Sequence, residues 1–517
     1  MHTEKNSELK GLTDVKKIYL SEHVTLDSNV FTGGGTDVTD EIQAILDTAP
    51  SYGDGGLHLV LDGAALVRGL KLHSNTTIEC PNKDCGLFLA DHVDRPILSN
   101  YDWSLYTIKT RNITIKGGTF NHNCTKQAWF VDTKVFPWPD DFNPPEWIEE
   151  IERHFVFLFE FYGVENFICD DVTFRNMRGY SLSLGNFINA RIENCELKIV
   201  DYVKPSNQDG FHIFGPGKHL IMKNLRGKSG DDYMNITPDE LDGKSSIEDV
   251  LVDGVFFDEA FQGIRLLSKK DGRLDRVTIR NVTGTYRTFG FSVIPFYPGN
   301  NFGNVGDICF ENIDLRQIQE TYHYTPLTFC QLGGNFENVT FKNVRFRNPI
   351  RKDVVFDIGR PFHYVPEFVA DEYVESDLGP STQMYEKEAL SPEFDRPTIK
   401  NFVIDGLVVE TDSKADDANI FEVRYNIDNF VAKNIQVFRT GDATTSGSLF
   451  KLCDEANIGN MIAEDIFAEK LNYVISGDEG NIDLLKADNI TLKNGKTVMN
   501  TSDINVKAVI ENNINEI

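Results

Sequence analysis

Three aspartates have the spacing that cleavage of a glycosidic bond would require. Asp209 opens a strand-like run that reads Asp-Gly-Phe-His-Ile, and Asp231 and Asp232 precede a second run, Tyr-Met-Asn-Ile. The 22 residues from Asp209 to Asp231 are close to one turn of a parallel β-coil. The two runs could then stack as neighbouring strands about 4.8 Å apart, with three carboxyl groups on one surface. Glycosidic cleavage uses such a set, in which one protonated acid releases the leaving oxygen and ionised carboxylates activate water.

Two other interpretations compete for these aspartates. They could be solvated acids of a loop, or they could bind calcium through their oxygens. The chain is rich in such residues, with 79 Asp and Glu against 51 Lys and Arg. The three residues alone therefore do not distinguish a catalytic site from a solvated loop or a calcium site. The elements that position them provide further evidence.

A repeated phrase surrounds the aspartates and favours a stack of coils. It consists of apolar alternation, then Asn or Asp, then an aliphatic residue or Gly, as in Val277-Thr278-Ile279-Arg280-Asn281-Val282. The step between copies is about 30 residues, which is typical of stacked repeats. Asn suits the recurring corner because it tolerates the left-handed backbone conformation and its amide can bond to the next coil. The marker residues fall at positions 194, 224, 253, 281, 312, 343, 405, 434 and 465.

The period-two alternation and the abundance of Val, Ile, Phe and Thr exclude a helical solenoid. We therefore predict an all-β chain, a single right-handed parallel β-helix over residues 31–517, preceded by an N-terminal extension over 1–30. A short helix with Ile42, Ile45 and Leu46 on one face is expected to cover the open end, capped by Asp40 with Gln43. Two insertions interrupt the period, near 124–155, which contains Trp138, and near 350–398.

Composition limits the partners. The net charge of −28 argues against nucleic acid and anionic membranes, because a surplus of Lys and Arg is missing. No segment is apolar enough to span a bilayer, and the eight Cys lack metal-type spacing. We expect a carbohydrate partner, no cofactor and no metal, and the sequence does not indicate an oligomeric state. The start of the chain indicates either a cytoplasmic protein or one whose export signal was removed before the numbering began.

The two motifs resemble those of a known family. Asn207-Gln208-Asp209-Gly210 followed by Gly230-Asp231-Asp232 is similar to the Asn-Thr-Asp and Gly-Asp-Asp motifs of glycoside hydrolase family 28, which includes polygalacturonases and rhamnogalacturonases. The resemblance covers roughly residues 30–320. It implies a right-handed parallel β-helix, Asp231 as general acid, Asp209 and Asp232 as the carboxylates that activate water, and inversion at the anomeric carbon. Crowding of three carboxyl groups supports the same division, since one of them should keep its proton near neutral pH.

The sequence also departs from that family. Its Gly-His-Gly motif is absent, and the corresponding coil reads Gly263-Ile264-Arg265-Leu266. The Arg-Ile-Lys motif that holds a galacturonate carboxylate has no clean counterpart, although Arg265 could stand for its arginine. The usual clamp for uronic acids is therefore incomplete, and a galacturonan substrate does not follow from the resemblance.

Strand alternation predicts a row of outward-facing polar residues beside the acids. If Phe211, Ile236 and Ile264 face the core, the side chains next to them in sequence point the other way. These outward residues are His212, Asn235, Arg265 and Ser292, with Tyr233, Lys269, Lys270, Tyr297 and Trp138 as further candidates for binding substrate. An ordinary exposed His212 and a structural ion pair of Arg265 with an Asp are the competing interpretations.

Three functions follow in order of preference. The first is a glycoside hydrolase that cleaves a pectin-like or related glycan by metal-independent acid/base catalysis, with exo action if the Trp-rich insertion closes the groove. The second is a calcium-dependent polysaccharide lyase or epimerase, for which Arg265 would supply a base. The third is a non-catalytic carbohydrate-binding β-helix, in which the acids only bind sugar.

Overall fold

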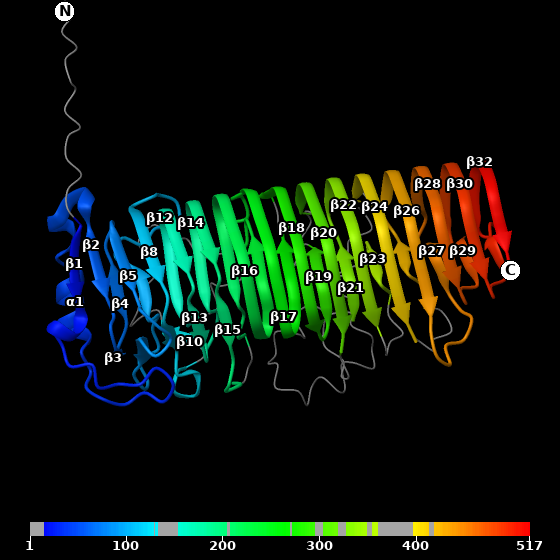
Figure 1. The fold of residues 1–517 in the computed structure, drawn as a ribbon. Helices are drawn as coiled ribbons and strands as arrows, with labels where there is room; N and C mark the ends of the chain where they lie inside the picture. The colour runs from blue at the N-terminus through cyan, green and yellow to red at the C-terminus, as the bar shows by residue number, and fades with distance from the viewer. Residues whose placement is uncertain are drawn as a thin grey trace, which may run out of the picture.

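The structure is a computed structural model that describes residues 15–128, 130–132, 153–203, 207–268, 271–294, 303–318, 327–348, 354–359, 397–412 and 418–517. It is one long stack of coils, with the N-terminal coils at one end and the C-terminal coils at the other (Figure 1). Each coil pairs in parallel with the next, as β14 does with β16 and β26 with β28. The predicted right-handed parallel β-helix is confirmed.

The strands form three walls. The wall that carries the three aspartates, called the site wall below, includes β4 (Leu70–Leu72), β7 (Leu98–Asn100), β19 (Phe289–Ile294), β21 (Thr328–Leu332), β23 (Phe356–Ile358), β25 (Phe421–Val423), β27 (Ser448–Leu452), β29 (Tyr473–Gly477) and β31 (Thr497–Met499). The second wall starts with β1 (Lys16–Tyr19), β2 (Leu57–Val60), β5 (Thr76–Glu79) and β8 (Thr110–Lys116). The third starts with β3 (Ala64–Val67), β6 (Gly86–Leu89), β9 (Thr119–Asn121), β13 (Thr173–Arg175) and β15 (Glu196–Lys198).

Longer strands turn the corners between walls without a break. They are β12 (Phe159–Asp170), β14 (Leu182–Glu193), β16 (Phe211–Thr237), β17 (Ile247–Leu267), β18 (Arg273–Tyr286), β20 (Asn304–Gln317), β22 (Asn335–Asn348), β24 (Thr398–Thr411), β26 (Asn426–Arg439), β28 (Ala456–Glu469), β30 (Gly480–Lys493) and β32 (Ile504–Glu516). A separate antiparallel pair joins β10 (Phe130–Asp132) to β11 (Arg153–Phe155). β16 and β17 both end on the site wall, and both ends belong to the candidate site.

The interior is filled by apolar side chains that stack from coil to coil. One continuous core cluster runs from Leu20 to Ile504. Phenylalanine rings lie over one another within it, with centroids 4.7 Å apart for Phe310 and Phe341 and 4.4 Å apart for Phe356 and Phe421. Each coil buries its apolar surface only by stacking on the adjacent coils. A single coil could therefore not fold alone, and the chain repeats the unit.

The predicted role of the corner asparagines is confirmed. Asn281, Asn312 and Asn343 all have a positive φ, between 53° and 58°. Their amides form a ladder in which Asn312 donates to Asn281 at 3.2 Å and Asn343 donates to Asn312 at 3.1 Å. Where the phrase carries Gly instead, as at Gly406, φ is 85°, so the same corner is kept without the amide. The ladder therefore fixes where each coil turns from the second wall to the third.

The N-terminal end differs in part from the prediction. The helix α1 (Thr39–Leu46) buries Ile42 and Leu46 and lies at the end of the stack, as expected (Figure 1). It begins one residue before Asp40, so Asp40 is not its cap, and the capping residue Val38 makes no side-chain bond. Short 3₁₀-helices flank it or follow it: η1 (Leu20–Glu22), η2 (Ala49–Gly55) and η3 (Cys124–Lys126). β1 already pairs with β2, so strand pairing starts before the expected boundary at residue 31.

The long insertion near 350–398 does not add a coil. β22 pairs directly with β24, so the doubled step between markers 343 and 405 spans one coil rather than two. Most of both predicted insertions lies outside the described residues.

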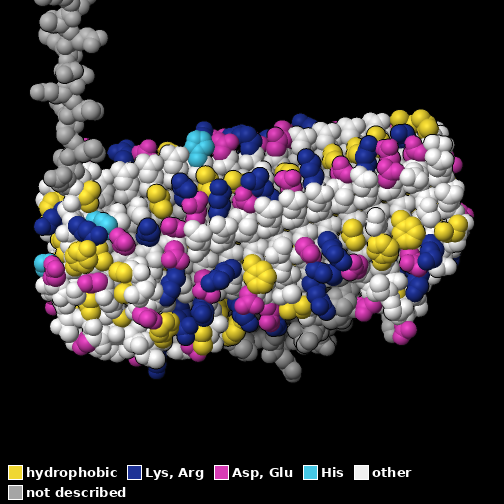
Figure 2. All heavy atoms as spheres, in the orientation of Figure 1, with side chains coloured by type: hydrophobic (Ala, Val, Ile, Leu, Met, Phe, Trp, Pro, Cys, Tyr) yellow, Lys and Arg dark blue, Asp and Glu magenta, His cyan; other side chains and the backbone are white. Residues whose placement is uncertain are grey.

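The face shown in Figure 2 carries basic and acidic side chains that alternate along the axis. No helix in the described part of the chain combines the length and apolar character needed to cross a membrane.

Candidate active site

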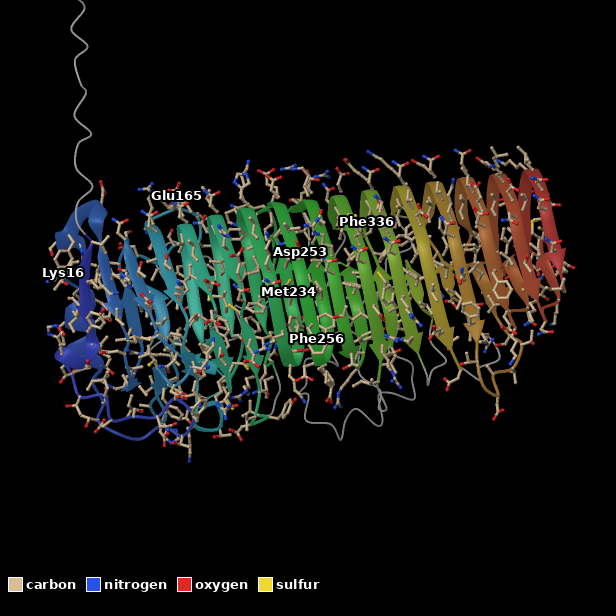
Figure 3. The ribbon with its side chains drawn as sticks, in the orientation of Figure 1. Lys16, Glu165, Met234, Asp253, Phe256 and Phe336 are labelled. Carbon is tan, nitrogen blue, oxygen red and sulfur yellow. The ribbon has the colours of Figure 1, made fainter. Side chains whose placement is uncertain are left out.

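The predicted outward row exists on the site wall. The backbone N–H of Gly210 donates to the carbonyl of Asp232, which sets the start of β16 beside its own end, one coil later. Asn235 then pairs with Arg265, and Arg265 pairs with Ser292. Met234, labelled in Figure 3, belongs to the core, so its neighbour Asn235 faces outward. The sequence alternation therefore located this row correctly.

The pairing of β16 with β17 is irregular next to Asp231 and Asp232. Ser229 pairs with Ala260 and Asp232 with Gln262, so three residue steps on β16 face two on β17. The extra residue is a β-bulge, a feature that redirects side chains at the end of a regular ladder. The charges of Asp209 and of the consecutive Asp232 both raise the pKa of Asp231, and the charge of Asp232 also raises the pKa of Asp209. All three carboxyl groups are thus electrostatic neighbours, as the sequence predicted.

Arg265 binds Asp232. Its Nε lies 2.8 Å from Asp232 Oδ2, and its terminal nitrogen donates to Gln262. The guanidinium carbon also lies 5.0 Å from the centroid of the Phe289 ring, a cation–π contact. Both partners are buried, so the pair is fixed rather than fluctuating at a surface. The structural ion pair that competed with a binding role is therefore present, and it involves a candidate catalytic residue.

His212 is held between two carboxyl groups and two aromatic rings. Its Nδ1 lies 3.2 Å from Asp209 Oδ2, and its Nε2 lies 3.3 Å from Glu240 Oε2. The imidazole stacks on Tyr180 with centroids 4.1 Å apart and on Phe214 with centroids 4.4 Å apart. It is 2% exposed, so it is not the ordinary surface residue of the competing interpretation. The position and the protonation state of His212 therefore affect the pKa of Asp209 directly.

The titration of these groups is strongly perturbed. Burial raises the pKa of Asp209 to about 7, against a hydrogen bond from His212 that lowers it. Burial alone would lower the pKa of His212, but its bonds to Asp209 and Glu240 raise it to about 9. Near neutral pH an imidazolium therefore faces Asp209 at the point where that carboxyl group gives up its proton.

The two consecutive acids differ in their surroundings. Burial raises the pKa of Asp231 well above its usual range, and the charges of Asp209 and Asp232 raise it further. Burial also raises the pKa of Asp232, but Arg265 opposes that rise through its charge and its hydrogen bond. Asp209 and Asp232 are buried and Asp231 is half-buried. The carboxyl group whose pKa is raised most thus belongs to the least buried of the three residues.

Some predicted binding residues lie elsewhere. Tyr233 is in the core rather than at a rim, because two consecutive residues, Tyr233 and Met234, face inward where the strand turns the corner. Its ring packs on Phe257 with centroids 4.9 Å apart. The remaining candidates, Trp138, Lys269, Lys270 and Tyr297, lie outside the described residues.

Sequence reasoning missed two residues of the site, Glu240 and Tyr180, and a third acid on the same wall, Glu160. Glu240 comes from the segment after β16 and reaches back one coil to His212, so no local motif marks it. Tyr180 precedes β14 and stacks its ring on His212. Glu160 lies two coils earlier on the same wall, where burial raises its pKa to about 7. Extension of the alternation backwards from His212 through Ser183 would have found Glu160.

A calcium site is the competing interpretation of the three aspartates. In the part of the chain that the structure describes, no group of three or more His, Cys, Asp or Glu side chains is arranged to hold a metal ion. The oxygens of Asp209 and Asp232 instead face the cationic groups of His212 and Arg265. This donor set suits proton transfer and stabilisation of charge.

The sequence matches no protein-family model, and no curated protein sequence matches it either. Solved structures with a similar architecture include the family 28 exopolygalacturonase of Yersinia enterocolitica, at 12% identity and a TM-score of 0.44 over 97% of this chain and 78% of that one. The hyperthermoactive exopolygalacturonase of Thermotoga maritima has 12% identity and a TM-score of 0.41 over 97% and 91%. The A-module of a mannuronan C-5 epimerase of Azotobacter vinelandii has 14% identity and a TM-score of 0.44 over 90% and 97%. At this level of similarity, the function has to be argued from the site.

Proposed function

We propose that the protein is a glycoside hydrolase that cleaves O-glycosidic bonds of a poly- or oligosaccharide with Asp231, Asp209 and Asp232. The observation that carries the proposal is the contrast among the three neighbouring carboxyl groups. Burial and the charges of Asp209 and Asp232 raise the pKa of Asp231 well above its usual range, against the charge of Arg265, and within the described residues Asp231 forms no ion pair; Asp209 faces His212 and Asp232 faces Arg265. When neighbouring carboxyl groups have different surroundings, their pKa values differ, and one can act as the acid while another acts as the base.

Each group then has a role. Asp231 donates its proton to the glycosidic oxygen as the bond from that oxygen to the anomeric carbon breaks. A water molecule attacks the anomeric carbon and gives its proton to Asp209 or Asp232, whose ionised forms are favoured by His212 and Arg265. The products are two sugar chains, one with a new reducing end. Inversion at the anomeric carbon follows from the resemblance to family 28.

His212 and Arg265 serve mainly as positioning residues in this proposal. His212 is fixed by stacking and by Glu240, so it orients Asp209 and favours its ionised form. Arg265 does the same for Asp232. Asn235 and Ser292 follow on the same row and are proposed to contact the sugar. Asp231 is the least buried of the three aspartates, and substrate is proposed to approach from its side.

The test is hydrolysis by the full chain, before and after Asp231→Asn. We expect wild type to release reducing ends from at least one member of a panel of neutral and acidic glycans. The substitution should lower that rate at least about a hundredfold, since loss of a general acid costs about 10²–10⁴. Asp258→Asn is the matched control, because Asp258 is an exposed aspartate on β17. Activity that persists in Asp231→Asn, with folding intact, would refute the assignment.

A further inference from the structure

The second wall carries a row of charged side chains whose sign alternates from coil to coil. The row lies just before the asparagine corner in eight consecutive coils, which pair in register. Every member is half-buried or exposed, so the row belongs to the surface of the wall. The members, called the charged row below, are Lys223, Asp253 (labelled in Figure 3), Arg280, Glu311, Lys342, Asp405, Lys433 and Glu464.

Ion pairs within the chain account for only half of the charged row. Arg280 Nη2 lies 2.8 Å from Asp253 Oδ2, and Lys433 Nζ lies 2.9 Å from Glu464 Oε2. The other four members form no ion pair with any residue that the structure describes; they are Lys223, Glu311, Lys342 and Asp405. Two of these four, Glu311 and Lys342, are neighbours at the middle of the row. The centre of the row therefore has charge that a second molecule could neutralise.

An uncharged row runs beside the charged row, two positions earlier on each strand. Residues two apart on a strand point to the same face, so both rows face outward. The uncharged row consists of Ile221, Leu251, Thr278, Cys309, Thr340, Val403, Val431 and Ile462, all half-buried. Five of these eight side chains are aliphatic. The wall thus presents an apolar band with charges along one edge, which is the composition of a protein–protein interface.

The order of the signs makes the wall complementary to itself. Two copies can pack by this wall about a two-fold axis that lies in the interface and crosses the coils. Their helix axes are then antiparallel, and each row faces the same row of the other copy in reverse order. With the axis between Glu311 and Lys342, the facing pairs are Lys223 with Glu464, Asp253 with Lys433, Arg280 with Asp405 and Glu311 with Lys342. A shift by one coil would place like charges together, so the signs also fix the register.

The uncharged row and the edge of the wall fit the same arrangement. Ile221 faces Ile462 of the second copy, and Leu251 faces Val431. At the corner before the uncharged row, four residues face asparagines: His219 with Asn460, Asp249 with Asn429, Arg276 with Asn401 and Asp307 with Asn338. One coil further out, Glu193 would face Asp488, so complementarity is confined to the eight coils.

The area of this stretch is sufficient for a specific interface. Seven coil steps of about 4.8 Å and a width of about five residues at 3.3 Å give on the order of 1,100 Å² for the two copies together. Specific interfaces begin at about 1,000 Å².

We propose that the second wall is a dimer interface, on which a second copy of this chain packs with its helix axis antiparallel. The inference is independent of the proposed function, because the three aspartates belong to the site wall. It assigns the alternation of charge along the second wall to recognition between copies as well as to contacts within one chain.

The test is the mass of the full chain by sedimentation velocity at low salt, from about 1 to 100 µM, a range that includes a micromolar Kd. We expect wild type to reach twice the 58.5 kDa of one chain. Glu311→Lys and Lys342→Glu each place like charges together at two symmetry-related positions. Each should raise the Kd at least about tenfold.

A mixture of the two single variants separates recognition from damage to the fold. In a heterodimer of Glu311→Lys with Lys342→Glu, both central contacts again join opposite charges, so the mixture should dimerise with a Kd close to that of wild type. Asp258→Lys reverses an exposed charge of β17 outside the second wall and should leave the Kd unchanged. A wild type that stays monomeric at 100 µM, single variants that dimerise as wild type does, or a mixture that stays monomeric would overturn the interface.

Discussion

At the scale of residues, the neighbours of each aspartate determine its pKa and therefore which of the three keeps its proton. Asp209 has a cationic imidazole at 3.2 Å, Asp232 has a guanidinium at 2.8 Å, and Asp231 is flanked by both carboxyl groups. Burial raises the pKa of all three, and the two cations oppose that rise at Asp209 and Asp232. The order of proton release follows from these contacts rather than from the residue type.

This order predicts how pH controls the rate. With Asp209 as base, activity should rise with pH as Asp209 ionises, near its pKa of about 7. His212→Asn removes the bond that lowers that pKa, so the rising limb should move to higher pH. A bond to a charged group is worth about 1.5–3 kcal/mol, which corresponds to about 1–2 pH units. The measurement is kcat/KM against pH for both proteins.

Two further variants make that experiment specific. Glu240→Gln should move the limb in the same direction by a smaller amount, because it weakens the support of the imidazolium without removing it. His219→Asn replaces an exposed histidine on β16 and should leave the profile unchanged. A limb that stays in place, or moves to lower pH, in His212→Asn would contradict the role given to His212.

At the scale of elements, the corners and one bulge decide where side chains point. Asn281, Asn312 and Asn343 hold the second corner in register by φ and by amide bonds. The extra residue between Ser229 and Asp232 interrupts the ladder where the acids occur. The regular corners stabilise every coil, whereas register shifts occur in a few coils, including the one that carries Asp231 and Asp232.

The ladder predicts a graded loss of stability. Asn312→Gly keeps the positive φ and loses the two amide bonds, so it should cost about 1–2 kcal/mol. Asn312→Ala also forces a Cβ-bearing residue without a polar side chain into the left-handed region, which should add about 1 kcal/mol. Native-state hydrogen exchange of β18, β20 and β22 would measure both. Equal effects of the two substitutions would show that backbone conformation is not what Asn312 provides.

The elements also show what the sequence can and cannot reveal. Periodicity located the coils, the asparagine corners and the outward row through His212, Asn235, Arg265 and Ser292, because each of these depends on spacing along the chain. Glu240 could not be found in this way, since it reaches His212 from a segment without repeat character. Tyr233 was misplaced because alternation fails at a corner, where two consecutive residues face inward. The bulge has no signature in residue type.

At the scale of the whole molecule, the stack provides a long, rigid wall on which rows of side chains recur at each coil. The acids occupy one stretch of that wall, and the polar row continues from them through Gln331 to Asp357. The net charge of −28 surrounds this surface with a negative field.

The origin of the oxygen in the product tests the central claim most directly. Hydrolysis places one oxygen of water on the anomeric carbon of the new reducing end, whereas elimination gives an unsaturated sugar without it and epimerisation leaves the chain uncut. The experiment is digestion of a glycan that the wild type cleaves, in ¹⁸O-water, with mass spectrometry of the products. We expect one ¹⁸O for each bond cleaved, and neither cleavage nor label with Asp231→Asn. Unlabelled or unsaturated products, or full labelling by Asp231→Asn, would contradict hydrolysis by these three aspartates.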